Sequence, residues 1–441
     1  MSREALARHI IGTLRARGHQ AWLVGGCVRD LLLRVPAKDY DVATDARPER
    51  ILELFPGSGQ VGAHFGVVLV RAGGAEVEVA TFRSDLAYSD GRRPDGVRYE
   101  AGPREDALRR DFTINALFLD PDTGRVLDFV GGQADLRAGL IRAIGDPEAR
   151  FREDHLRLLR AVRFAARLGF AIDGATLAAM ARLGKLILAV SAERVRDELV
   201  RILTEGGARR GFELLDATGL LRDILPEVAA MHGVAQPPEY HPEGDVWVHT
   251  LMLLEKLERP TPALAMGALL HDVGKPPTFR VAGRIRFDGH VEAGVEIARR
   301  ILARLRFSND ETGQVLALVA NHMRFKDVGN MRESTLKRFL RLPRFDEHLE
   351  LHRLDCLASH GRLETYALVK SRYEGMPGEE LKPALLITGR DLIAQGFEPG
   401  PPFARMLAAV EDAQLEGRIR TRDEALALIL GEFGAPTRAG T

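Results

Sequence analysis

Sequence patterns typical of β-strands are confined to about the first 145 residues of this 441-residue chain. In residues 38–44 and 75–82, polar and apolar side chains alternate with a period of two, which is typical of half-buried strands. From about residue 146 onward, apolar residues recur with helical spacing instead. This asymmetry predicts a small α+β head followed by a long all-α remainder. Such a layout suggests a catalytic head with a helical substrate arm.

Stretches rich in proline and glycine, such as residues 226–245, suggest where the helical part divides. We expect four parts: a head over 1–145, a helical neck and body over 146–225, a histidine-rich helical domain over 226–365 and a helical tail over 366–441.

The composition excludes some classes of protein. Lys+Arg and Asp+Glu both number 62, so the chain is neither a histone-like basic protein nor one with a dominant acidic tail, although a basic groove could be balanced elsewhere. Cys27 and Cys356 alone cannot build a disulfide framework or a cysteine-rich zinc site. The N-terminus has the pattern of a charged amphipathic helix, and no run of 18 apolar residues occurs. We therefore expect a cytoplasmic protein without a signal peptide or membrane partner.

Asp39 and Asp41 stand two residues apart in one predicted strand, so their side chains would lie on the same face. Adjacent carboxylates repel each other and need a cation, and magnesium prefers oxygen ligands. Glu76 or Glu78, on another predicted strand, could supply a third carboxylate. Such a cluster can hold two metal ions that activate an attacking oxygen and stabilise a leaving one.

A candidate phosphate site precedes the two aspartates. In LVGGCVRD (23–30), a predicted strand leads through Gly25 and Gly26 into a helix start, where backbone N–H groups could face an anion and Arg29 could add a charged contact. A glycine pair alone is usually an ordinary turn. Its combination with two aspartates within seventeen residues is far more specific.

Three blocks, LVGGCVRDLLL…KDYDVAT (23–44), RRDFTINAL (109–117) and EDHLRLLRAVRFAARLGF (153–170), resemble the signatures of bacterial class II tRNA nucleotidyltransferases. These are CCA-adding enzymes and their poly(A) polymerase relatives, within the polymerase-β-like superfamily. The resemblance implies a polymerase-β-like head in which Asp39 and Asp41 bind Mg²⁺ and Glu78 supports them. It also implies a set of nucleotide-binding residues: Gly25, Gly26 and Arg29 at the triphosphate, and Arg109, Arg110, Asp111 and Asn115 around the nucleotide and its sugar.

Asp154, Arg157, Arg160 and Arg163 recur at every third position, so we expect them along one side of a single long helix, facing a cleft. A carboxylate can accept a hydrogen bond from the exocyclic amine of adenine or cytosine while a guanidinium donates to the ring nitrogen, which discriminates against guanine and uracil by about 1–3 kcal/mol per bidentate pair. In the family this motif is a protein template, and Asp154 and Arg157 occupy its positions. The alternative is a salt bridge worth only about 0.2–0.5 kcal/mol. Residues 150–210 carry thirteen Lys/Arg against seven Asp/Glu, which fits either RNA contact or a solvated surface.

Residues 84–105 are rich in Gly, Pro, Asp and Arg and are predicted to form a long loop that includes Arg92-Arg93-Pro94. CC-only relatives carry a shortened segment here, so the full-length loop favours addition of the terminal A, alone or after CC.

A third group of residues gives the order His249, His271-Asp272, Asp355 around the motif LLHDVGK (269–275). Such a set can surround one divalent metal ion, and His290 and His322 could supply a second. The pattern resembles the HD phosphohydrolase superfamily, which some CCA-adding enzymes carry at this place to remove phosphate from 2′,3′-cyclic ends or 2′-nucleotides. Lys275 could stabilise a transition-state oxyanion.

These expectations converge on a tRNA nucleotidyltransferase that adds CCA, or its terminal A, to tRNA from CTP and ATP, with a phosphohydrolase activity at a second metal site of unknown metal. Alternatives are a poly(A) polymerase, an HD-type phosphohydrolase with a degenerate head, and a non-catalytic RNA-binding adaptor. The sequence leaves the added nucleotides and the oligomeric state open.

Overall fold

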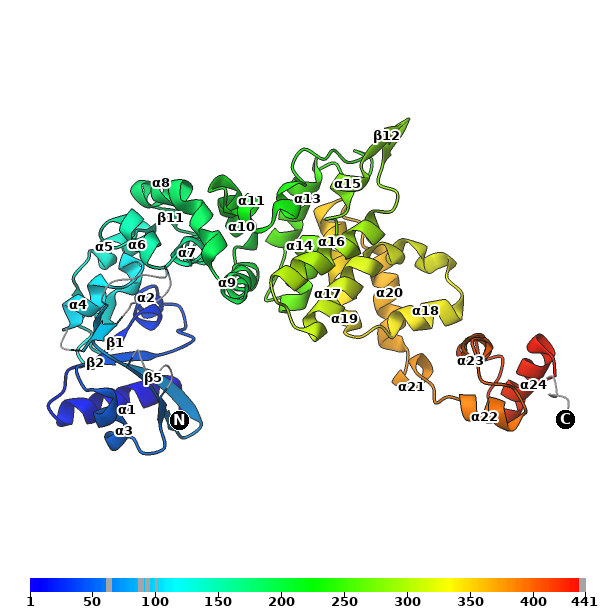
Figure 1. Ribbon diagram of the computed structural model, residues 1–441, viewed down its shortest axis with the longest axis horizontal. Helices are drawn as coiled ribbons and strands as arrows, with labels where there is room; N and C mark the ends of the chain where they lie inside the picture. Colours follow the sequence, from blue (N-terminus) through cyan, green and yellow to red (C-terminus); the bar gives the residue numbers. More distant parts are fainter. Residues whose placement is uncertain (61–65, 86–90, 92–95, 100–101, 436–441) are drawn as a thin grey trace. The chain divides into compact units, whose positions relative to one another are not determined.

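The computed structural model describes residues 1–60, 66–85, 91, 96–99 and 102–435. The chain forms two compact units, each of which is described separately below (Figure 1). Unit 1 comprises Met1–Ala230 together with Leu257–Pro262 and Ile301–Phe307, and unit 2 comprises Met231–Lys256, Ala263–Arg300 and Ser308–Thr441.

A seven-stranded mixed sheet forms the centre of the head in unit 1, with the strand order β3-β4-β5-β2-β1-β8-β9. Neighbouring strands run antiparallel except β2 and β5, which pair in parallel with Asp41 opposite Glu78. The strands are β1 (Ala21–Val24), β2 (Asp41–Thr44), β3 (Gly59–Gln60), β4 (Val67–Ala72), β5 (Ala75–Thr81), β8 (Leu117–Leu119) and β9 (Val126–Asp128). The parallel pair therefore places two carboxylate-bearing residues side by side.

Helix α1 (Arg3–Ala16) packs against this sheet, contacting β1, β2 and β5. It begins at Ser2, whose hydroxyl accepts a hydrogen bond from the Ala5 backbone, and it buries Leu6, Ile10 and Leu14 at helical spacing. The other head helices are α2 (Gly26–Leu32), α3 (Pro48–Leu54), α4 (Pro103–Leu108) and α5 (Gly132–Ala138). An α+β head is thus confirmed.

Two sequence-based expectations about strands are wrong. Asp39 precedes β2, which begins only at Asp41, so the two aspartates do not share one strand. Strands also occur beyond residue 146, namely β11 (Ala171–Ile172), which pairs with β10 (Leu140–Ile141), and the hairpin β12 (Arg280–Ala282) and β13 (Arg284–Arg286). Segments of two or three residues are too short to show alternation. Within the predicted loop 84–105, short strands β6 (Ser84–Asp85) and β7 (Val97–Arg98) pair, and Arg92-Arg93-Pro94 lie outside the described residues.

The long helix expected around residue 154 is also wrong, because α6 (Pro147–Glu153) ends there and α7 starts at Arg157 and runs to Leu168. Asp154 has an extended backbone, and its side chain accepts a hydrogen bond from the Leu156 N–H at 3.1 Å. Aspartate often competes with helical hydrogen bonding in this way. The remaining helices of the neck are α8 (Gly174–Leu183), α9 (Ala192–Thr204), α10 (Ala208–Ala217), α11 (Leu220–Ile224) and α12 (Pro226–Ala229).

Unit 2 is built mainly from helices, and the hairpin β12–β13 projects from it beside α15 (Figure 1). One apolar core gathers around Phe325, Phe339 and Phe345, and a second in the C-terminal part gathers around Leu392 and Ile429. No helix among the described residues combines the length and apolar character needed to cross a bilayer. The helices are α13 (Val246–Glu255), α14 (Pro262–Leu270), α15 (Lys275–Thr278), α16 (His290–Arg304), α17 (Asn309–Asn321), α18 (Glu333–Leu340), α19 (Phe345–Ala358), α20 (Glu364–Gly375), α21 (Gly378–Leu381), α22 (Gly389–Ala394), α23 (Pro402–Leu415) and α24 (Arg422–Phe433).

Candidate active site and candidate metal centre

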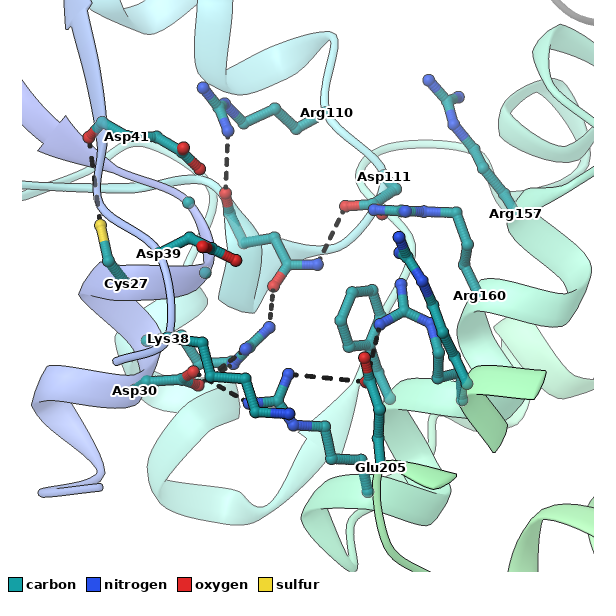
Figure 2. A pocket seen from close by; sticks show the side chains of 18 of the residues that line it. Cys27, Asp30, Lys38, Asp39, Asp41, Arg110, Asp111, Arg157, Arg160 and Glu205 are labelled. Carbon is teal, nitrogen blue, oxygen red and sulfur yellow. Dashed lines mark hydrogen bonds and ion pairs between the residues drawn. The ribbon is translucent and has the colours of Figure 1, made fainter. Parts of the chain in front are cut away.

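A polar cavity of about 610 Å³ opens in unit 1 between the carboxylate end of the sheet and helix α7 (Figure 2). Its lining contains ten basic and six acidic side chains, a net charge of +4. All eleven residues that the sequence analysis selected for nucleotide binding line this cavity, together with Asp39 and Asp41. Glu78 is not part of the lining. A cavity of this charge suits a polyanionic ligand.

The carboxylates of Asp39, Asp41 and Glu78 lie close enough to affect one another. Burial and the neighbouring Glu78 carboxylate raise the pKa of Asp41 to about 6, Asp39 raises it further, and Arg110 opposes the rise. Asp39 is largely exposed, and one of its oxygens accepts a hydrogen bond from Arg3 at 2.9 Å. A half-buried carboxylate beside two others is a site at which a cation would relieve repulsion.

The two candidate third carboxylates of β5 are in different environments. Glu76 pairs with Arg71 on β4 at 2.6 Å, whereas Glu78 stands in register with Asp41. This arrangement favours Glu78 as the third carboxylate.

Gly25 forms the turn between β1 and α2 with φ +78°, a backbone conformation that favours glycine. A Cβ atom at this position would lie 3.3 Å from Arg110 Nη1 and 3.8 Å from Asp41 Oδ2. The missing side chain therefore lets the backbone approach the Asp41 carboxylate closely. At Gly26 a Cβ atom would come no nearer than 3.7 Å to Arg29 Nη2, so this position is less constrained.

Arg29 is buried in the cavity wall, with 2% of its surface exposed. Its guanidinium donates to Asp30 Oδ1 at 2.8 and 2.7 Å and to Asn115 Oδ1 at 2.7 Å. Asp30 also pairs with Arg167 at 3.1 Å. In this structure Arg29 therefore orients Asn115 and, through Asp30, joins α2 to α7. These hydrogen bonds are formed in the absence of substrate, and a triphosphate would contact Arg29 at the edge of their network.

Asp106 was missed by the sequence analysis, although it is buried directly behind two arginines of the cavity wall. One carboxylate oxygen accepts from Arg109 at 2.5 and 2.8 Å and the other accepts from Arg110 at 2.9 and 3.2 Å. Burial opposes ionisation, but the two arginines hold the pKa of Asp106 below its usual value. Its spacing of three and four residues before the arginine pair, on one helix, was the available signal. Asp106 therefore fixes both guanidinium groups, of which that of Arg110 acts on Asp41.

Asp111 links the head to α7. Its carboxylate accepts from Arg160 at 2.6 and 2.9 Å, from Asn115 Nδ2 at 3.1 Å and from the Phe112 backbone at 2.8 Å. Burial works against the charged form, but Arg160 and Asn115 lower the pKa of Asp111 to about 2. Asp111 is therefore ionised and holds Arg160 in the cavity wall.

Asp154 and Arg157 both line the cavity, but each has another partner within the protein. Asp154 accepts from Arg194 Nη2 at 3.0 and 3.1 Å. Arg157 donates to Glu153 at 2.6 Å and to two backbone carbonyls, one of them that of Arg109. The i, i+3 salt bridge that the sequence offered as an alternative is therefore not formed. Arg194, forty residues away on α9, carried no sequence signal.

Arg163 is held away from the open part of the cavity. It is 4% exposed and pairs with the buried Glu198 at 2.6 Å and with Glu205 at 3.3 Å. The Arg163–Glu198 pair joins α7 to α9, so Arg163 links these helices as well as lining the cavity.

In unit 2 the structure brings together all four residues of the histidine–aspartate pattern. His249 Nε2 lies 3.1 Å from Asp355 Oδ1 and 3.3 Å from His271 Nε2. Asp272 lies 3.2 Å from His271 Nε2, and its other oxygen lies 3.7 Å from His322 Nε2. Asp272, His290 and His322 form a second group whose ligand atoms lie within 4.8 Å of one another.

The four histidines share one orientation. Each turns Nδ1 to an outer acceptor and Nε2 to the centre: His271 to the Ala268 carbonyl, His290 to the Phe287 carbonyl, His322 to the Val319 carbonyl, and His249 to Glu243 at 2.7 Å. An Nδ1 beside a carbonyl must carry the proton, so the neutral ring presents an Nε2 lone pair. Among the described residues, the buried Nε2 atoms of His290 and His322 have no hydrogen-bond partner. This is the arrangement expected of metal ligands.

Two further residues complete this cluster. Glu243 was not selected from the sequence, and it accepts from both His241 at 2.9 Å and His249 at 2.7 Å. Lys275 is buried, and its ammonium group contacts Asp272 at 2.7 Å and Gln236 at 2.6 Å. Lys275 is therefore part of the cluster wall rather than an exposed side chain.

Comparison with known proteins gives consistent results over the whole chain. Residues 21–142 match the family model of the poly(A) polymerase head domain, 169–231 match an RNA- and SrmB-binding site of polymerase A, and 290–430 match a tRNA nucleotidyltransferase domain 2. The mixed sheet with its carboxylate edge thus defines a polymerase-β-like nucleotidyltransferase head.

Relatives of nearly the same length show which family of nucleotidyltransferases the chain belongs to. The chain is 31% identical to the CCA-adding enzyme of Latilactobacillus sakei over 96% of both chains, and 35% identical to the CC-adding tRNA nucleotidyltransferase of Thermus thermophilus over 93% of both. It also resembles the crystal structure of the Bacillus stearothermophilus CCA-adding enzyme in complex with CTP, with 27% identity, 98% coverage of both chains and a TM-score of 0.75. The chain therefore belongs to the family of CCA-adding enzymes and related tRNA nucleotidyltransferases.

Proposed function

We propose that this protein transfers nucleotides from CTP and ATP to the 3′ end of tRNA at the cavity of unit 1. The observation that carries the proposal is the half-buried Asp41 carboxylate, in register with Glu78 and facing a cavity of net charge +4. The cavity offers positive charge for a triphosphate, and the carboxylates offer a cation site at its edge. Family membership supports the same reaction.

The carboxylate set fits magnesium, because its donors are all oxygen atoms and because Asp41 is half-buried beside two like charges. Asp39 and Asp41 would hold the ion, with Glu78 supporting Asp41 from the neighbouring strand. When bound, magnesium lowers the pKa of an attacking hydroxyl and neutralises charge on the leaving pyrophosphate.

The chain's own residues contribute positioning and charge. Arg109 and Arg110, held by Asp106, both line the cavity, and the guanidinium group of Arg110 lies near Asp41, where a triphosphate would lie. Arg160, held by Asp111, supplies a further charge from the opposite wall. These side chains are fixed before substrate arrives, so little reorganisation is needed when charge develops.

This proposal is tested with Asp41→Asn, which keeps the size of the side chain. We expect nucleotide incorporation to fall by at least about 100-fold, because one oxygen ligand of the cation is lost, while tRNA binding and the unfolding temperature stay within error. Asp45→Asn, at the far end of β2, is a matched control and should retain activity. Near wild-type incorporation by Asp41→Asn would refute the assignment of the site.

The number of nucleotides added follows from a second experiment. Transcripts that end before CCA, after C and after CC are incubated with magnesium and CTP or ATP, and products are resolved to one nucleotide. We propose that the shortest transcript gains CCA and that extension then stops. A product that ends in CC would instead indicate a CC-adding enzyme like the Thermus relative. Addition of A only to the CC-ended transcript would indicate an A-adding enzyme. Long A tails would indicate a poly(A) polymerase.

We also propose that Asp154 and Arg157 select the base. Both side chains line the cavity. Arg157 would exchange a partner within the protein for a base edge, whereas Asp154 would accept from the base while still held by Arg194. The double variant Asp154→Ala, Arg157→Ala should relax the preference for CTP and ATP over UTP and GTP by about 10-fold or more, since each bidentate pair contributes about 1–3 kcal/mol. An unchanged preference would refute the template role.

A second function is favoured by the inward-facing Nε2 atoms of unit 2. We propose that His249, His271, Asp272 and Asp355 hold one divalent cation, that His290 and His322 extend the cluster around Asp272, and that the site hydrolyses phosphate esters. The nitrogen-rich donor set fits a transition metal or zinc better than magnesium. Such an ion polarises a phosphoryl oxygen and lowers the pKa of a bound water.

Binding and turnover are measured separately. Mn²⁺, Ni²⁺ or Zn²⁺ should raise the unfolding temperature and change the fluorescence of Trp247, which lies two residues from His249 on α13. His271→Ala should abolish both effects and the hydrolysis of a 2′,3′-cyclic nucleotide, but leave nucleotide addition intact. His360→Ala, an exposed histidine outside the cluster, is the control. Wild-type metal binding by His271→Ala would refute the site.

A further inference from the structure

The hairpin β12–β13 of unit 2 carries three arginines on one face. Arg280 pairs directly across the hairpin with Arg286, and Arg284 follows on the same face, because residues two apart in a strand point to the same side. The opposite face carries Val281 and Ile285. The hairpin turns at Gly283, whose φ is +69°.

The arginine face is exposed and lacks internal charge compensation. All three arginines are exposed, and within the part of the chain that the structure describes none of them forms an ion pair. Like charges directly opposite each other destabilise a hairpin, and an isolated two-stranded hairpin is only marginally stable. An anionic partner lying along this face would remove the repulsion.

The base of the hairpin leads directly to the candidate metal centre. Phe279 and Phe287 close the hairpin with ring centroids 6.0 Å apart. Lys275 Nζ lies 5.4 Å from the centroid of the Phe287 ring, and the Phe287 carbonyl accepts from His290 Nδ1 at 2.9 Å. The base of the hairpin is therefore separated from the Asp272 cluster by a single aromatic residue, since Lys275 contacts Asp272 at 2.7 Å.

We infer that the hairpin binds the phosphate backbone of RNA and brings a 3′-terminal phosphate to the metal centre of unit 2. Three arginines on one face suit RNA, because a guanidinium group binds a phosphate through two parallel hydrogen bonds, while Phe279, 39% exposed, and Val281, 72% exposed, on the other side of the narrow hairpin offer surface to sugars and bases that reach around its edge. An acidic peptide would use the charge alone. This inference rests on the proposed function in taking tRNA as the substrate and in placing a metal ion at the Asp272 cluster.

The experiment measures the binding of tRNA to the protein, without nucleotide addition. Fluorescence anisotropy of labelled tRNA is followed with the full chain in EDTA and without nucleotide, over a series of about 50 to 200 mM salt. For the triple variant R280A/R284A/R286A, we expect the slope of log K against log salt to fall by about 2–3, since each lost phosphate contact removes about 0.7–0.9. Affinity at the upper salt limit should fall at least about threefold.

Two companion variants separate charge from position. R280K/R284K/R286K keeps the charge of the hairpin and should stay within about one unit of the wild-type slope. R17A/R125A/R137A removes three exposed arginines of the head and should bind tRNA like the wild type. An equal loss in this control, or no loss in the hairpin variant, would overturn the inference.

The outcomes distinguish the inference from the proposed function. If the wild-type chain fails to bind tRNA, the proposed function fails as well. If it binds and R280A/R284A/R286A binds equally, only the hairpin inference fails. Displacement of the hairpin-dependent part of the binding by polyglutamate as effectively as by unlabelled RNA would show a non-specific acidic partner and also overturn the inference.

Discussion

Replacing Asp111 with asparagine tests whether its link to Arg160 holds the head against α7. The substitution keeps the shape of the side chain but removes the charge that Arg160 contacts at 2.6 Å. The pKa of Asp111 is lowered from 3.8 to about 2. At 1.36 kcal/mol per pKa unit, this shift corresponds to about 2.5 kcal/mol of stability at pH 7.

The expected loss depends on pH with a definite sign. A carboxylate whose pKa is lower in the folded state contributes its full stabilisation above its unfolded pKa and loses it as pH falls through the folded value. For Asp111 the contribution should fall from about 2.5 kcal/mol at pH 7 to about 1.3 kcal/mol at pH 3. The wild type and Asp111→Asn should therefore approach each other in acid.

The assay follows urea unfolding by tryptophan fluorescence at both pH values. The chain has two tryptophans, Trp22 on β1 in unit 1 and Trp247 on α13 in unit 2, so the measurement is made in a Trp247→Phe background that reports unit 1 alone. Asp122→Asn, an exposed aspartate, is the control and should change the free energy of unfolding by less than about 0.5 kcal/mol. A difference below that value at pH 7, or one that does not shrink by pH 3, would refute the reasoning.

Three further predictions concern other parts of the two sites. Gly25→Ala should reduce nucleotide incorporation more strongly than Gly26→Ala, because only Gly25 has a positive φ and lies close to Arg110 and Asp41; similar kinetics for the two variants would contradict this. Asp106→Ala should lower the free energy of unfolding of unit 1 by about 3–5 kcal/mol in urea titrations, since it leaves two arginines without a shared counter-charge; a loss below about 1 kcal/mol would contradict it. Glu243→Gln should weaken the metal-dependent rise in unfolding temperature, with the metal Kd raised about 10- to 100-fold, because His249 loses the partner that orients it; an unchanged Kd would contradict it.

The parts of the fold that the sequence predicted are those with strong local periodicity. Strand β5 was predictable because its residues alternate between buried and exposed over seven positions. Strand β8 was not, because Leu117 and Phe118 are both buried and show no alternation. The break between α6 and α7 was missed because it depends on a side-chain hydrogen bond of Asp154 to its own backbone segment, which helical spacing does not reveal.

The site residues also divide into those with a local sequence signal and those without one. The carboxylates, the arginine pair and the histidine–aspartate pattern were found because their types and spacing are distinctive. The partners that hold these residues were not selected. Asp106 could have been, because it stands only three and four residues before the arginine pair. Arg194 and Glu243 could not, since the first reaches Asp154 across forty residues and the second lies in a proline-rich connector without helical pattern.

Unit 1 is built from three separate stretches of the chain, and this limits where the protein can be cut without dividing a unit. Residues 257–262 and 301–307 return to unit 1 after the chain has entered unit 2, and there Arg304 pairs with Glu227 at 2.7 Å while the Arg306 carbonyl accepts from Arg196. A fragment ending at residue 230 would leave both partners without these contacts. Recombination or proteolysis at that junction would therefore separate unit 1 from two of its own segments, and a fragment meant to contain the whole of unit 1 has to extend through residue 307.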